Sequence, residues 1–251
     1  MKAQQLQLDT IANNIANVNT EGFKKSRLSF RSLLYQTLKE PGAPTSASQV
    51  QPTGLQIGSG AEISASTRDF RQGELLPTEG QLDLGIQGEG FFRLRLPTGE
   101  FRYTRNGTFR LDAAGTLVSS DGYPLDGAPA IPIDAVSIVV SEDGTISTLN
   151  GADQLPQQLG QLQLTRFPNP TGLKAQGRSL FTESGSSGAA QTQTPGQAGA
   201  GLIIQCFLER SNVQTVDELV ALIVAQRNYE VNSRAIRASD EMLQQTNQLI
   251  N

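Results

Sequence analysis

The sequence has no histidine, no tryptophan and only one cysteine, Cys206, in 251 residues. Without histidine, Ser–His and Cys–His nucleophile pairs are excluded, as are His-ligated metal sites and the commonest general base. A lone cysteine excludes an intramolecular disulfide and a cysteine-rich metal site. These absences leave few routes to catalysis, so we expect no enzyme, no catalytic residue, no metal and no cofactor.

Charge and long apolar runs are also scarce. The formal net charge is −4 at pH 7, from 20 Lys and Arg against 24 Asp and Glu. A nucleic-acid partner is not expected, because it would require a basic face. No apolar run is long enough to span a bilayer, and the N-terminus lacks the residue order of a cleaved secretory signal. Direct insertion into a membrane is therefore not expected.

What the sequence does have is a long helical pattern at its end. Residues 213–250 contain no Gly or Pro, and a helix from Val216 to Ile250 would be about 50 Å long. The row of residues that starts at Leu219 and also repeats every seventh position is polar after its first member, so the apolar stripe of the helix is narrow. Such a stripe needs partners, which could be other copies or the chain's own core. Its seam repeats every seventh residue, the coiled-coil period, through Leu222, Tyr229, Ile236, Leu243 and Ile250.

The beginning of the chain offers a partner for that helix. Residues 4–18 are predicted to form an amphipathic helix, and Gly22 provides a stop signal. The apolar stripe of this helix consists of Leu8, Ile11, Ile15 and Val18. Three polar amides interrupt it, at Asn13, Asn14 and Asn17. They are either solvated or buried to fix the register against neighbouring helices.

Two segments follow before the centre of the chain. The helical pattern is predicted to resume after Phe23 and to run through Leu28, Leu33, Leu34 and Leu38, where Pro41-Gly42 ends it. Residues 40–60 are rich in Pro, Gly, Ser, Thr and Gln. Their composition indicates a linker or an extended excursion of the chain.

The centre reads as β-structure. Alternating apolar and polar residues with intervening turns predict hairpins over 92–104, 108–118 and 136–147, and one more strand over 159–167. Residues 184–201 are predicted to be a flexible connector. We therefore expect an α+β protein, in which the N- and C-terminal helices pair as an α-helical coiled-coil domain around a central, mostly antiparallel β-domain. The expected divisions are residues 1–40, 41–63, 64–205 and 206–251.

Few residues suggest chemistry. Asp112, Asp121, Asp126 and Asp134 fall in or near turns, where Asp usually caps or forms the turn. A glycosidase needs only two carboxylates, so an envelope carbohydrate-processing enzyme or binding module remains an alternative. The glycines of residues 85–90 precede a strand rather than a helix, which argues against a phosphate site.

The terminal residues carry a family resemblance. Residues 11–23, Ile-Ala-Asn-Asn-Ile-Ala-Asn-Val-Asn-Thr-Glu-Gly-Phe, resemble the amino-terminal signature of the rod and hook proteins of the bacterial flagellum. Further blocks are similar to the distal-rod subunit in particular, at residues 23–26, 33–36, 54–58, 88–92, 211–213, 218–220, 226–233 and 242–243. Family members usually carry a further short apolar stretch before the position of Met1.

The resemblance implies a structural subunit that polymerises into the distal rod around a central export channel and transmits torque to the hook. The implied partners are further copies of the chain, proximal-rod proteins below, hook protein above, the P- and L-ring proteins around the rod, and the flagellar type III export machinery. The implied location is the basal-body rod in the periplasm, reached without a cleaved signal peptide. A proximal-rod or hook subunit of the same family is the alternative.

The apolar stripes and the resemblance together give an expected assembly interface in the helical core. It comprises Leu8, Ile11, Asn14, Ile15, Asn17, Val18, Gly22, Phe23, Leu219, Leu222, Tyr229, Ile236, Leu243 and Ile250. The resemblance also implies that residues 41–63 form a rod-specific contact between subunits, represented by Pro41, Gly54, Leu55 and Ile57.

Overall fold

The structure, a computed structural model, describes residues 2–39, 44–46, 49–50, 53–132, 134–150 and 156–250. The chain divides into two compact units. Unit 1 comprises Met1–Asn13, Ser26–Thr67 and Val216–Asn251, and unit 2 comprises Asn14–Lys25 and Arg68–Thr215. Each unit is described by itself.

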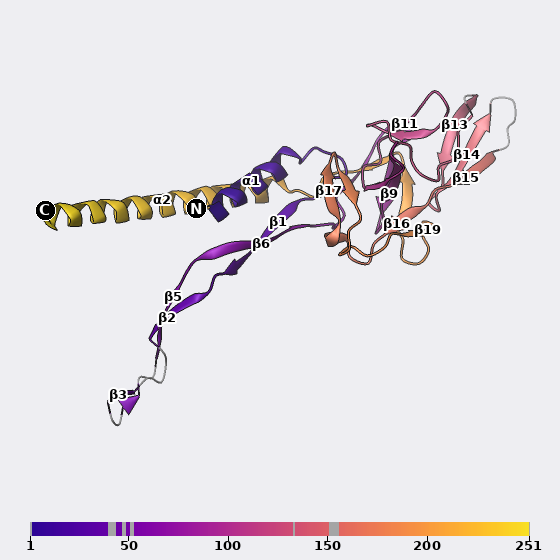
Figure 1. Cartoon of the computed structure of the whole chain (residues 1–251). Helices are drawn as coiled ribbons and strands as arrows, with labels where there is room; N and C mark the ends of the chain where they lie inside the picture. Colours follow the sequence, from indigo (N-terminus) through magenta and orange to yellow (C-terminus); the bar gives the residue numbers. More distant parts are fainter. Residues whose placement is uncertain are drawn as a thin grey trace. The chain divides into compact units, whose positions relative to one another are not determined.

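Unit 1 contains most of both helices, α1 (Lys2–Ala16) and α2 (Thr215–Ile250). The two helices are in contact, and α2 is one continuous helix of 36 residues (Figure 1). Asp217 and Glu218 lie in the first turn of α2, where acidic side chains complement the positive end of the helix dipole. Both predicted terminal helices and their pairing are confirmed. No described helix is long and apolar enough to cross a membrane.

The rest of unit 1 is a β-ribbon, which we call the arm (26–67). Figure 1 shows it as a long two-stranded ribbon in which β1 pairs with β6, β2 with β5 and β3 with β4. Its strands are β1 (Ser26–Ser32), β2 (Tyr35–Lys39), β3 (Pro44–Ser46), β4 (Gln49–Val50), β5 (Leu55–Gly58) and β6 (Ala61–Arg68).

The helix predicted from Phe23 through Leu38 is therefore wrong. Leu28 and Phe30 alternate with polar residues at the strand period of two, and the apolar spacing at Leu33, Leu34 and Leu38 concealed that alternation. Strand β5 returns the chain along β2, so that Tyr35 lies opposite Gly58. Pairing with a distant strand decided the structure here, since local propensity is a weak determinant.

Unit 2 is built from short strands and one 3₁₀ turn. They are β7 (Leu75–Pro77), β8 (Leu84–Gln87), β9 (Phe92–Arg95), β10 (Phe101–Thr104), β11 (Phe109–Leu111), β12 (Leu117–Ser119), β13 (Ala135–Val140), β14 (Thr145–Asn150), β15 (Gln157–Gln161), β16 (Leu164–Arg166), η1 (Pro170–Gly172), β17 (Lys174–Gly177), β18 (Leu180–Thr182), β19 (Gln191–Gln193), β20 (Leu202–Gln205) and β21 (Phe207–Glu209).

The strand pairs of unit 2 are antiparallel, as predicted. The largest described sheet has the order β17-β18-β10-β9, and a second has the order β13-β14-β15. The three predicted hairpins are confirmed as β9–β10, β11–β12 and β13–β14. In the turn between β13 and β14, Gly144 has a φ of 81°, a conformation that glycine adopts without a steric penalty.

Two predictions in this region need correction. The single strand expected over 159–167 is two strands, β15 and β16, which belong to different sheets. The segment 184–201 is not simply a connector, because its strand β19 pairs with β16. Its small polar residues make local hydrogen bonds instead of apolar contacts: the Ser187 hydroxyl donates to the Ser184 carbonyl at 2.8 Å. Such bonds give no hydrophobic period from which order could be predicted.

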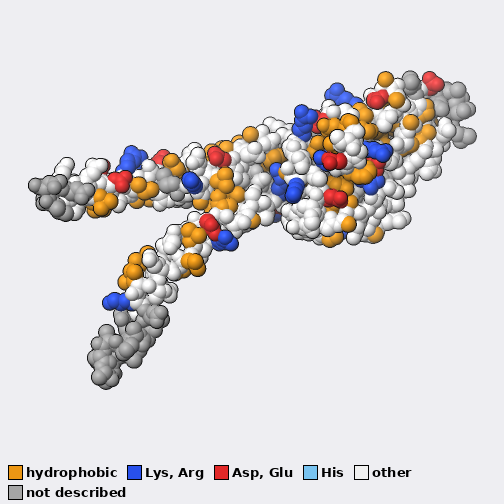
Figure 2. All heavy atoms as spheres, viewed as in Figure 1, with side chains coloured by type: hydrophobic (Ala, Val, Ile, Leu, Met, Phe, Trp, Pro, Cys, Tyr) orange, Lys and Arg blue, Asp and Glu red, His pale blue; other side chains and the backbone are white. Residues whose placement is uncertain are grey.

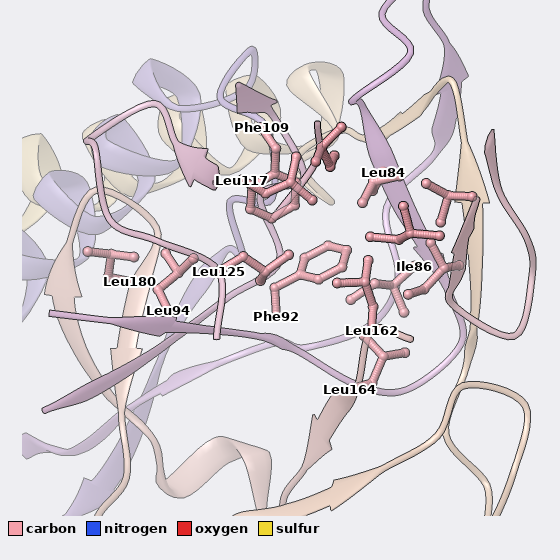
Figure 3. Packing of buried hydrophobic residues seen from close by; sticks show 14 residues of the cluster. Leu84, Ile86, Phe92, Leu94, Phe109, Leu117, Leu125, Leu162, Leu164 and Leu180 are labelled. Carbon is pink, nitrogen blue, oxygen red and sulfur yellow. The ribbon is translucent and has the colours of Figure 1, made fainter. Parts of the chain in front are cut away.

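The main core of unit 2 is a cluster of 14 buried apolar side chains, shown as sticks in Figure 3. Phe92 and Phe109 meet edge to face within it, with ring centroids 5.1 Å apart, an arrangement that the ring quadrupoles favour. Strands from separate hairpins supply these residues, so the core joins the small sheets. A second buried cluster consists of Phe91, Tyr103, Phe167, Leu173 and Phe181.

Candidate assembly interface

The helix α2 exposes most of its predicted seam. Leu219 is 44 % exposed, Ile236 48 % and Leu243 62 %, while Leu222 is half-buried. Figure 2 shows apolar side chains along this helix. Ile250 lies in α2, and its side chain is outside the described set. Tyr229, also of the seam, is exposed. Other large apolar side chains exposed on α2 are Val216, Val220, Ile223, Val224, Val231 and Met242.

Burial along α2 is confined to its beginning. Ala225 is buried at 2 % exposure, whereas every described side chain from Gln226 to Gln248 is exposed except Ser233, which is half-buried. A helix gains most of its stability from packing of its apolar face rather than from propensity. The second half of α2 therefore presents an apolar face that the described residues of the chain do not cover.

The residues predicted on the N-terminal stripe are more buried. Ile11 is 7 % exposed and Asn14 2 % exposed. Leu8, Ile15, Asn17 and Val18 are half-buried. The structure thus places the N-terminal stripe largely under cover within the chain, and the predicted role of its amides in fixing register stays a prediction.

The arm also presents apolar side chains to solvent. Leu55 is 50 % exposed and Ile57 53 % exposed, and Gly54 beside them is exposed too. Pro41 lies outside the described residues. An isolated two-stranded ribbon is at best marginally stable in water, so these side chains are available for contacts with another chain. Further exposed apolar residues on the arm are Phe30, Leu34, Tyr35 and Leu38.

Gly22 and Phe23 are placed differently, inside unit 2. The Gly22 amide donates to the Glu209 carbonyl at 2.8 Å. Gly22 has a φ of 65°, and an added Cβ would lie 2.4 Å from the Asn106 nitrogen. Phe23 is 8 % exposed, and the Arg68 guanidinium lies 5.8 Å from its ring centroid. These residues connect the segment after α1 to the β-strands of unit 2.

A buried charge cluster, which we call the junction triad (Lys24, Arg105, Glu209), lies at the same connection. Lys24 Nζ donates to Glu209 Oε1 at 2.5 Å and to the Arg71 carbonyl at 2.8 Å. Arg105 Nη1 lies 3.5 Å from Glu209 Oε2. Glu209 Oε1 also accepts the Gly73 amide at 2.8 Å. No local pattern predicts this cluster, because its members are far apart along the chain.

Burial dominates the electrostatics of the triad. It lowers the pKa of the Lys24 ammonium, while Glu209 acts in the opposite direction and Arg105 adds to the lowering. Burial likewise lowers the pKa of Arg105, against the attraction of Glu209. Buried charges are costly unless they are paired and hydrogen-bonded. The triad is therefore a specific connection, in which loss of Glu209 would leave two buried cations without their carboxylate partner.

Asn212 makes a second connection between the same segments. Its side-chain nitrogen donates to the Asp69 and Arg71 carbonyls at 2.7 and 3.0 Å. Its side-chain oxygen accepts the Lys25 amide at 2.9 Å. The segments that follow α1 and precede α2 are thus both fixed to unit 2 by polar contacts.

Three of the four candidate carboxylates have structural partners, and Asp134 is exposed. Asp121 pairs with Arg178 at 3.3 Å, Asp126 pairs with Arg93, and Asp112 accepts the Ala114 amide within its turn. Among the described residues no group of three or more His, Cys, Asp or Glu side chains is arranged to hold a metal ion.

Comparison with known families covers much of the chain. Residues 1–24 match the family described as flagella basal body rod protein. Residues 85–148 match the flagellar hook protein FlgE/F/G D1 domain. Residues 204–249 match the flagellar basal body rod FlgEFG protein C-terminal family.

Curated relatives match along almost the whole chain. The flagellar basal-body rod protein FlgG of Caulobacter vibrioides is 44 % identical over 250 residues, covering 99 % of this chain and 95 % of the relative. FlgG of Borreliella burgdorferi is also 44 % identical, over 251 residues and with the same coverage. FlgG of Bacillus subtilis is 41 % identical over 250 residues, covering 98 % of this chain and 94 % of the relative.

Proposed function

The chain belongs to the FlgG family of flagellar basal-body rod proteins, and from that membership we propose that it builds the distal rod by self-assembly through its terminal helices. It is a structural subunit of the basal-body rod and not an enzyme. In the proposed polymer, α1 and α2 of many copies form an inner tube around an export channel. The tube transmits torque to the hook.

One observation carries this proposal: the second half of α2 leaves its apolar face uncovered. Burial of apolar surface contributes about 25 cal/mol per Å², and each copy would repeat that contribution along a lattice of heterologous contacts that does not close. Residues such as Ile236 and Leu243 supply that surface. The proposed interface is the helical set predicted from the sequence, with Gly22 and Phe23 acting from within unit 2 to hold the helices in place.

Assembly with other flagellar components follows from family membership. The proposed neighbours are proximal-rod proteins at one end, hook protein at the other, and the P- and L-ring proteins around the rod, after delivery by the flagellar type III export machinery. The arm and residues 41–63 are proposed to make rod-specific contacts between copies. The four-part division of the chain at residues 40, 63 and 205 is proposed on the same basis.

Substitution of Ile236 by Asp tests the proposal. A carboxylate on the exposed apolar face should prevent rod formation, because assembly would bury an unpaired charge. The isolated chain should keep its stability within about 0.5 kcal/mol, as is usual for exposed positions. Rods are scored by electron microscopy of basal bodies, and folding of unit 2 by resistance to protease.

The matched control is Ala238→Asp. Position 238 lies about 200° around the helix from position 236, and Ala238 is also exposed. The same charge introduced there should allow assembly. Rods of normal length from the Ile236→Asp variant, or loss of rods from both variants alike, would contradict an interface on this face of α2.

A further inference from the structure

Unit 2 contains an open cavity of about 460 Å³ beside the junction triad. Its aromatic walls include Phe70, Phe91 and Phe167. Phe91 and Phe167 meet edge to face with centroids 5.9 Å apart, and both are almost fully buried. Aromatic rings carry a partial positive charge at their edges, so such walls accept an apolar stem that ends in a negative group.

Arg105 lines this cavity, and two of its side-chain nitrogens make no hydrogen bond to the described residues. It is 4 % exposed. Its Nη2 donates to the Gly88 carbonyl at 2.7 Å, but its Nε and Nη1 have no hydrogen-bond acceptor among the described residues. The 3.5 Å separation between Nη1 and Glu209 Oε2 is too long for a good charge-assisted bond. A buried guanidinium whose N–H groups lack hydrogen-bond acceptors is unusual and needs an explanation.

The charged groups beside the cavity carry an excess of positive charge, which also favours a negative ligand group. The junction triad has two cations and one carboxylate, all buried, so it carries one excess positive charge. The other two guanidiniums that line the cavity are already paired, Arg71 with Asp69 and Arg166 with Glu89. Asp69 and Glu89 also attract the cations of the triad at longer range, but among the described residues neither makes an ion pair with them. A further carboxylate in direct contact with Arg105 would therefore stabilise the excess charge.

We propose that in the assembled rod this cavity receives a carboxylate side chain from a neighbouring copy of the same chain. This inference rests on the proposed self-assembly. A helical lattice brings a different surface of the next copy against each unit, and Asp and Glu outnumber Lys and Arg in every copy, 24 to 20. Assembly also holds such a side chain at a high effective concentration, which a free anion lacks. The inserted carboxylate completes the charge balance of the triad only in the polymer.

Site-specific photo-cross-linking in assembled rods tests this inference. A benzophenone amino acid replaces Thr171, an exposed residue at the cavity lining. Digested rods are analysed by mass spectrometry. The expected product joins residue 171 to a peptide of a second copy that contains an Asp or Glu. The control places the same amino acid at Gln176, which is exposed on β17 and does not line the cavity.

The Arg105→Met variant tests the charge requirement. It removes the excess cation and leaves the Lys24–Glu209 pair, so the cross-link at residue 171 should fall by at least about fivefold, as expected for loss of a charge-assisted contact. Circular dichroism verifies folding. Should that variant not fold, Arg105→Gln serves instead, because it removes the same charge and keeps an N–H group that could donate to the Gly88 carbonyl.

The outcomes separate the two proposals. If the unsubstituted chain forms no rods, self-assembly itself fails. If rods form but residue 171 cross-links to no acidic peptide of a second copy, or the yield is unchanged when the cation is removed, only the cavity proposal is overturned. Cross-linking to a different protein would also overturn it.

Discussion

Lys24 Nζ donates a hydrogen bond of 2.5 Å to Glu209 Oε1, across 185 positions of sequence, and both side chains are completely buried. Lys24 follows the segment after α1, and Glu209 ends β21 shortly before α2. Within unit 2, this ion pair thus joins the segment that follows α1 to the segment that precedes α2.

Removal of the cation in that pair should be costly. Lys24→Met leaves Glu209 buried without its closest partner, and breaking a buried pair costs about 3–5 kcal/mol. Urea unfolding followed by far-ultraviolet circular dichroism measures the loss. Lys39→Met, at an exposed position in the arm, should change stability by less than about 0.5 kcal/mol. Equal stability of the two variants would show that the pair contributes nothing.

Gly22 should not tolerate a side chain. Gly22→Ala combines a positive φ with a Cβ only 2.4 Å from the Asn106 backbone nitrogen. Gly99→Ala is the control, because Gly99 has a φ of 86° but no atom within 4 Å of an added Cβ. Gly99→Ala should lose about 1–2 kcal/mol from strain alone, and Gly22→Ala should lose more. Thermal melting of both variants measures the difference, and equal losses would argue against the close contact.

Asp69 should contribute a pH-dependent part of the stability of unit 2. Its hydrogen bonds with the Arg71 side chain hold the pKa of this carboxyl below its usual value of 3.8. Because the unfolded chain takes up the proton first, the contribution is complete above pH 3.8 and is lost as the pH falls through the folded-state pKa.

The difference in unfolding free energy between the wild type and Asp69→Asn should therefore shrink as the pH falls below 3.8. Arg71→Met should remove most of this part, since the Arg71 amide remains as a donor to Asp69. The double variant should show no more pH dependence than Asp69→Asn alone. Urea titrations at a series of pH values test this. A difference that stays constant with pH would exclude the ion pair as its cause.

The arm should matter for assembly and not for folding. Leu55 and Ile57 are about half exposed, so replacing both by Ser should change the stability of the isolated chain by less than about 0.5 kcal/mol. Rod formation or rod stiffness should nevertheless change, because the proposed contacts between copies lose their apolar side chains. Electron microscopy and swimming assays measure this, and unaltered rods would remove the arm from the interface.

Local periodicity predicted the elements that are long or closed by short turns. The helical pattern that contains the heptad from Leu222 predicted a helix from Val216 to Ile250, and α2 begins one residue earlier, at Thr215. The turn at Glu142-Asp143-Gly144 predicted the β13–β14 hairpin. In both cases the pattern and the structure are set by residues near one another in sequence.

Features that depend on distant residues could not be predicted in this way. The strands of the arm were mistaken for a helix, because only the pairing of residues near Tyr35 with those near Gly58 distinguishes the two. The junction triad left no local signal, since a lysine, an arginine and a glutamate in separate segments look like ordinary surface charges. Signature residues such as Gly22 turned out to be buried beside it.

The most direct test of an uncovered helix is hydrogen exchange, followed peptide by peptide in the free chain and in isolated rods. We expect rapid exchange over residues 226–250 in the free chain, slow exchange over core strands such as β8 and β9, and protection of 226–250 in the rod. Protection of α2 in the free chain equal to that of the core strands would contradict this expectation, because the apolar face would then already be buried before assembly.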